Sequence, residues 1–209
     1  MFNLTDLTGL ASVASAITAF LLLLPGIYRL TKPRLAVLLG AVFVLVLIPF
    51  GGMPLAAYVR GATGDLSITT QVLLWCALLR PWCDCGMTDH RSRYVLLIMI
   101  VFAALTLYPI ALGIGAFDPY RLGYGDPLFV VALLILALSA WFRGLALIAL
   151  CIAFATLAWA IGWYESDNLW DYLLDPFVAG YALATIIFRA VQALLQRGGA
   201  QQSISRMSE

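Results

Sequence analysis

Three aspartates stand at regular intervals shortly before the last apolar stretch of the chain. Asp167, Asp171 and Asp175 are each four residues apart, and on a helix this spacing places their carboxylates along one side. The apolar residues among them fall on the opposite side. A row of carboxylates can bind a cation, a basic partner or a polar substrate.

Two other segments, 61–70 and 117–127, combine glycine with aspartate. Asp65 can cap the helix that follows it, while Asp118 and Asp126 each precede a proline, a pair that suits turns and helix starts. If the three segments converge, they form one acidic and aromatic surface. We predict that this surface binds a partner through Asp118, Tyr120, Arg121, Tyr124, Asp167, Trp170 and Tyr172.

The same carboxylates are candidates for catalysis. One carboxyl group can act as an acid beside an ionised partner, and a carboxylate cluster can bind a divalent cation. The candidates are Asp65, Asp126, Asp171 and Asp175. No defined metal site is predicted. The single histidine, His90, falls on the opposite side in the topology below, which excludes a Ser-His-Asp triad or a histidine-ligated zinc site among these aspartates.

The composition requires that these segments connect membrane spans. Hydrophobic residues make up 63% of the chain and charged residues only 11%, which is far from the balance of a soluble domain. A span needs about 20 apolar residues. We predict an all-α polytopic membrane protein with seven transmembrane helices, near residues 8–28, 35–58, 66–80, 94–113, 127–142, 145–163 and 176–195. The third and fifth are short.

The charged residues orient these spans. Ten of the twelve basic residues fall on one side: Arg29, Lys32, Arg34, Arg80, Arg91, Arg93, Arg143, Arg189, Arg197 and Arg206. Only Arg60 and Arg121 are left to neutralise the eight acids on the other side: Asp6, Asp65, Asp118, Asp126, Glu165, Asp167, Asp171 and Asp175. Because cytoplasmic loops are enriched in basic residues, the N-terminus is predicted outside and the C-terminus in the cytoplasm.

Local signals refine this arrangement. The prolines and glycines of segment 49–54 must break the second span, and the break either shapes a pocket or forms a simple exit turn. The segment around Asp171 is predicted as a short interfacial helix, capped by Ser166 or Asp167, with Trp170 and Tyr172 at the lipid headgroups.

Two domains and three functions are predicted. Residues 1–196 form the bundle, and 197–209 a polar cytoplasmic tail. The leading function is a non-catalytic subunit that docks another envelope protein through its outer loops. The first alternative is an enzyme of the outer face, a hydrolase or transferase that acts on a lipid-linked or polar substrate and uses an aspartate cluster with a divalent metal. The second alternative is a permease. The near absence of charges within the spans disfavours ion coupling.

Partners and location follow from the same features. Membrane lipids and another envelope protein are the predicted partners, whereas nucleic acid is excluded because the basic residues are scattered by ones and twos. The short loops and the cysteine-free outer segments suit a bacterial cytoplasmic membrane, with the acidic loops on the periplasmic side.

Overall fold

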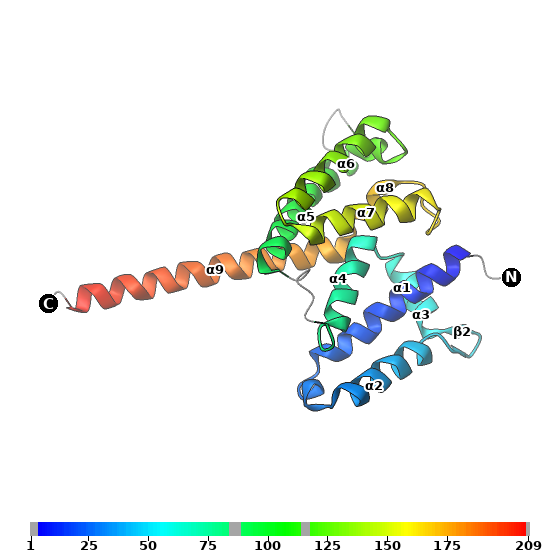
Figure 1. The fold of residues 1–209 in the computed structure, drawn as a ribbon, viewed down its shortest axis with the longest axis horizontal. Coiled ribbons are helices and arrows are strands. Elements are labelled where there is room, and N and C mark those ends of the chain that lie inside the picture. Colours follow the sequence, from blue (N-terminus) through cyan, green and yellow to red (C-terminus); the bar gives the residue numbers. More distant parts are fainter. Residues whose placement is uncertain (1–3, 84–88, 114–117, 208–209) are drawn as a thin grey trace.

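The computed structural model describes residues 4–83, 89–113 and 118–207, and most of this part of the chain is helical. The two termini lie at opposite ends of the molecule (Figure 1). The α-helices are α1 (Leu4–Phe20), α2 (Lys32–Leu45), α3 (Leu55–Thr63), α4 (Ile68–Leu79), α5 (His90–Ala111), α6 (Pro127–Phe142), α7 (Ala146–Ala160), α8 (Leu169–Leu173) and α9 (Pro176–Met207). The shorter elements are η1 (Leu21–Leu23), η2 (Ile27–Arg29), β1 (Pro49–Phe50), β2 (Met53–Pro54) and η4 (Pro119–Gly123).

Several helices are apolar enough for a membrane. Within the described residues, three helical stretches combine sufficient length and hydropathy to cross it: Thr5–Leu23, His90–Ile110 and Pro176–Gln196. Shorter apolar helices span Ile68–Leu79, Pro127–Phe142 and Ala146–Ala160. At 1.5 Å per residue the shorter helices reach about 18–24 Å, less than the roughly 30 Å of hydrocarbon. The chain is therefore a helical protein with the apolar helices of a membrane protein.

Glycines end two of the shorter helices. Gly144 follows α6 at φ 74° and Gly162 follows α7 at φ 63°. Both adopt the left-handed conformation that commonly closes a helix. For this reason α7 stops at Ala160, and it is shorter than the predicted span 145–163.

The predicted break in the second span is confirmed. After α2 the chain forms a tight antiparallel hairpin in which Pro49 pairs with Pro54, and α3 follows directly. Gly51 and Gly52 make the turn at φ 67° and 115°, a region that favours glycine. Because Phe50 is 83% exposed, the break is a surface turn.

Helix α4 lies between two groups of helices (Figure 1). It packs against α1, which also contacts α2 and α3, and against α7, which contacts α5, α6 and α8. The largest buried cluster belongs to the second group and includes Leu97, Ile148 and Tyr172. Smaller clusters join α1 to α2 and α1 to α3. The packing of α4 therefore fixes how the two groups meet.

Helix α9 crosses the predicted boundary between bundle and tail. It continues through residue 197 to Met207, and its C-terminal part extends away from the other helices (Figure 1). The residues after the apolar stretch include alanine, glutamine and arginine, which favour helix. The division into bundle and tail stays a prediction.

The short helix predicted before the last span is present as α8. Its N-cap is Asn168, whose side chain accepts from the amide of Trp170, rather than the predicted Ser166 or Asp167. Asn168 also donates to the carbonyl of Tyr120 in η4 at 3.0 Å. A Cβ at Gly123 would lie 1.8 Å from Asn168 Oδ1, so the contact between η4 and α8 requires a glycine there.

Gly123→Ala should therefore loosen this contact. We expect a loss of about 1–3 kcal/mol in the free energy of unfolding, because the added methyl group must displace Asn168. The control is Gly61→Ala in α3, where a Cβ meets open space and alanine should stabilise the helix by about 0.5–1 kcal/mol. Apparent melting temperatures in detergent measure both variants. Equal melting temperatures would contradict the close packing.

Candidate functional site

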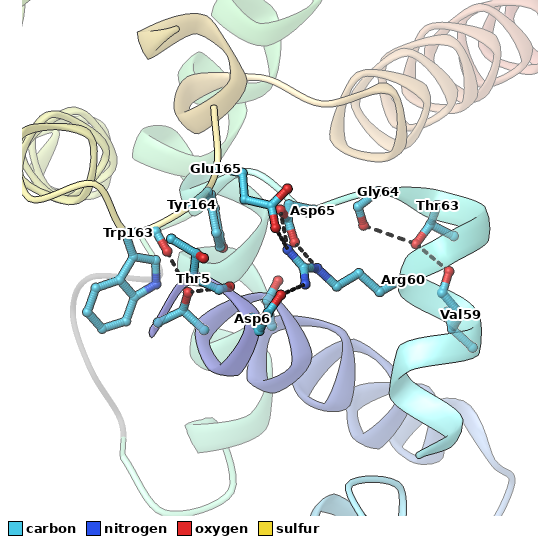
Figure 2. A network of polar contacts seen from close by, with 12 residues as sticks. Thr5, Asp6, Val59, Arg60, Thr63, Gly64, Asp65, Trp163, Tyr164 and Glu165 are labelled. Carbon is cyan, nitrogen blue, oxygen red and sulfur yellow. Dashed lines mark hydrogen bonds and ion pairs between the residues drawn. The ribbon is translucent and has the colours of Figure 1, made fainter. Parts of the chain in front are cut away.

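Arg60 lies at the centre of a carboxylate cluster that joins four parts of the chain (Figure 2). Its Nε and Nη2 bind Asp65 at 2.6 and 3.0 Å. Nη1 reaches Asp6 of α1 at 3.2 Å, and Nη2 lies 3.7 Å from Glu165 in the loop after α7. The side chain of Arg60 is only 17% exposed, so its charge is partly removed from water and needs these partners.

The Arg60 cluster is held by close packing as well as by charge. Hydrogen bonding to Asp65 raises the pKa of Arg60 above its usual value, although burial acts in the opposite direction. A Cβ at Gly9 of α1 would come within 2.4 Å of both Arg60 Nε and Asp65 Oδ1. The absence of a side chain at Gly9 therefore leaves the space that this ion pair occupies.

Asp65 has a different role from the predicted helix cap. Arg60 engages both of its carboxylate oxygens, and Ser67 caps α4 instead by accepting from the amide of Thr70. The bidentate geometry explains this outcome, because an arginine fork binds a carboxylate more strongly than a single amide does.

Asp171 joins α8 to η4 from within the protein. The hydroxyl of Tyr120 donates to its two oxygens at 2.9 and 3.0 Å, and Ser166 donates to Oδ2. Burial and the bond to Asp171 raise the pKa of Tyr120 above its usual value. Tyr120 is therefore a neutral hydrogen-bond donor that fixes the carboxylate.

The prediction that Tyr172 lies at the lipid headgroups is wrong, whereas that for the half-buried Trp170 stays a prediction. Tyr172 is fully buried, and its hydroxyl accepts from the amide of Tyr164 at 3.1 Å. Trp170 donates to the carbonyl of Pro119 at 3.0 Å, and its ring packs on Phe129 at 4.7 Å. Both polar groups find partners in neighbouring loops, so the aromatic face of α8 packs on protein.

Asp126 and Asp175 are both N-caps that precede a proline. Asp126 accepts from the amides of Leu128 and Phe129 in its own helix, α6. Asp175 accepts in the same way at the start of α9, but it also binds the amide of Ser67 at 2.8 Å and the hydroxyl of Thr70. With 5% exposure, Asp175 joins the N-terminal ends of α4 and α9.

The remaining predicted binding residues lie at the surface. Asp118 accepts from the amide of Tyr120 at the start of η4 and is exposed. Arg121 and Asp167 are also exposed, and the ring of Tyr124, 62% exposed, packs edge-on against Tyr120. The structure thus separates two groups of side chains. The first bonds within the protein and is called the buried frame here: Asp65, Tyr120, Trp170, Asp171, Tyr172 and Asp175. The second is an exposed rim that contains Asp118, Arg121, Tyr124, Glu165 and Asp167.

The candidate residues do not form an evident metal centre. Among the described residues, no group of three or more histidine, cysteine, aspartate or glutamate side chains has a geometry that could hold an ion. Where three carboxyl groups do converge, Arg60 lies between them. A divalent cation on the outer aspartates stays a prediction.

Sequence reasoning missed several residues of this region. It considered Arg60 only as one of two outer cations, and it assigned no role to Asn168 or Tyr164. Arg60 and Asp6 are 54 positions apart, and no local pattern links them. The one usable signal was the scarcity of outer cations, which makes Arg60 the natural partner of several acids.

The two Asp-Pro caps provide a matched test of these contacts. Asp175→Ala should lower the free energy of unfolding by about 2–4 kcal/mol, because it removes a cap and leaves the buried amide of Ser67 without its acceptor. Asp126→Ala should cost about 0.5–2 kcal/mol, since it removes only a cap. Melting temperatures of the two variants, measured in the same detergent, check the difference. A larger effect at Asp126 would contradict the assigned bridge.

Comparison with known proteins adds no assignment. No protein-family model matches this chain, and searches of curated proteins and of solved structures give no match. A function therefore has to be inferred from the residues of the chain itself.

Proposed function

We propose that this protein is a non-catalytic subunit of a membrane protein complex in the bacterial cytoplasmic membrane. In this proposal α1, α2, α4, α5, α6, α7 and α9 cross the membrane, with the N-terminus outside. The Arg60 cluster supports this topology, because its four members come from segments that the charge pattern assigns to the same side. The short helices α3 and α8 then belong to an outer layer on the periplasmic side.

The observation that carries the proposal is how the four candidate catalytic aspartates are used. Asp65 binds Arg60, Asp171 accepts from Tyr120 and Ser166, and Asp126 and Asp175 cap helices. Each of these carboxylates accepts at least two hydrogen bonds from groups within the chain. This pattern is typical of a structural frame, and it favours binding over turnover.

The exposed rim provides the surface for a partner. Asp118, Asp167 and Glu165 are exposed acids, and Tyr124 adds an exposed aromatic ring. The buried frame holds the loops that carry them, which reduces the ordering cost of association. A basic segment of another envelope protein has the complementary charge, and aromatic residues are enriched at protein interfaces.

The proposed topology can be tested with reporter fusions. Green fluorescent protein fused after Glu209 should fluoresce, because its chromophore forms when the C-terminus lies in the cytoplasm. Alkaline phosphatase should be inactive at that position and active when fused after Asp167, which we place in the periplasm. The opposite pattern would reject the orientation, and activity at both positions would reject the odd number of crossings.

The proposed docking can be tested by charge reversal on the rim. The protein is purified in native lipid discs, and every co-purifying protein is quantified by mass spectrometry. We expect a stoichiometric partner whose retention falls at least tenfold in the double variant Asp118→Lys, Asp167→Lys, because like charges then face each other. Tenfold corresponds to about 1.4 kcal/mol of binding free energy.

Two controls make this result specific. Gln196→Lys adds positive charge on exposed α9, at the predicted inner end, and should leave the partner bound. Asp118→Asn with Asp167→Asn should give an intermediate loss. A partner that stays bound after charge reversal, or a protein that purifies alone with a specific metal or polar substrate, would overturn the proposal.

A further inference from the structure

A groove of about 690 Å³ runs between α1, α4 and α7. Its volume is within the range of ligand-binding cavities in proteins. Apolar side chains from α4 and α7 line the end nearer α2, including Trp75, Leu79, Leu150 and Phe154. The 12 residues of α4 give this wall a length of about 18 Å, which is close to the thickness of one leaflet, roughly 15 Å.

The other end of the groove is polar. Thr8, Ser12 and Ser15 of α1 line it together with Gln71 of α4. Gln71 Nε2 donates to Ser12 Oγ at 2.6 Å and to the Ser12 carbonyl at 3.2 Å. Thr8 donates to the carbonyl of Trp163, so the polar end adjoins the layer that contains the Arg60 cluster. The groove thus changes from polar to apolar along its length.

Tyr164 brings a buried hydroxyl to the polar end. Its side chain lines the groove, the residue is only 4% exposed, and its hydroxyl has no hydrogen-bond partner among the described residues. The hydroxyl of Ser12 accepts from Gln71 and acts on Tyr164 as a donor, which lowers the pKa of Tyr164, so the proton of Tyr164 itself has no acceptor among the described residues. Buried polar groups nearly always have a partner, so this hydroxyl points to a ligand.

The conformation of Tyr164 is fixed by Tyr172. The two rings stack at 5.3 Å, and the Tyr164 amide donates to the Tyr172 hydroxyl. Burial raises the pKa of Tyr164 to about 12, so its hydroxyl keeps its proton at neutral pH. The groove therefore holds a rigid donor that suits an oxygen acceptor on a bound molecule.

We infer that the groove binds one acyl chain of a membrane glycerophospholipid, with an ester carbonyl of the lipid accepting a hydrogen bond from Tyr164. The apolar wall matches the chain in length and chemistry, and the polar end matches the ester. The inference rests on membrane insertion and not on the proposed docking partner.

Photo-crosslinking in lipid discs tests this inference. The discs contain a small fraction of phosphatidylglycerol with a photoreactive diazirine on its acyl chain, and crosslinked peptides are mapped by mass spectrometry. We expect crosslinks in 68–79 and 147–164 to exceed those at Leu134 and Ile135 of α6, which are exposed and contact only bulk lipid in our topology. Tyr164→Phe should lower the groove crosslinks about two- to tenfold and leave the α6 crosslinks unchanged.

A second tyrosine provides the matched control. Tyr108 also has a buried hydroxyl without a partner among the described residues, but it does not line the groove. Tyr108→Phe should leave every crosslink unchanged, while Leu150→Trp should reduce the groove crosslinks by filling the apolar end. Equal labelling of groove and α6, no response to Tyr164→Phe in a folded variant, or occupation by a polyprenyl phosphate or a second copy of the chain would overturn the inference.

Discussion

The half of the structure that contains α3 and α8 depends on one partly buried cation. Arg60 contacts carboxylates of α1, of the connection before α4 and of the loop after α7. A guanidinium removed from water is stable only when paired, and each carboxylate is separated from the others by many residues. These contacts therefore hold together segments that, within the described residues, the hydrophobic clusters join through α4. Gly9 completes the arrangement, because no side chain could replace its hydrogen without moving the ion pair.

The aspartates of this layer share a residue type but not an environment. Asp126 binds only the amides of its own helix, whereas Asp175 also binds α4 and is buried. Asp171 accepts from hydroxyl groups, and Asp167 remains exposed. Acidic residues that are clustered in loops can thus cap helices and hold loops together, and only the exposed ones are available to a partner.

The sequence predicted features that depend on local composition, and it missed those that depend on long-range packing. Two prolines that flank a pair of glycines break a helix, so the turn after α2 was predictable, as was the existence of α8. The surroundings of α8 were not predictable, because the sequence pattern of an apolar helix face is the same whether that face contacts lipid or protein. Tyr172 is buried because it belongs to the cluster formed with α4, α5, α7 and α9, and its hydroxyl binds the α7–α8 loop. Arg60 and Asp65 were visible in the sequence, but their pairing competes with helix capping, and geometry decides between the two.

The layer formed by α3, α8 and η4 shares a wall with the groove, which links the stability of this layer to the shape of the groove. Tyr172 of α8 binds the backbone of Tyr164 and stacks on its ring, and Tyr164 in turn lines the groove. Asp171, one residue before Tyr172, anchors the same helix to η4. Any displacement of α8 relative to α7 must therefore break these bonds and move the hydroxyl that faces the groove. A lipid held by Tyr164 would oppose that displacement, because its binding free energy is lost when the hydroxyl moves.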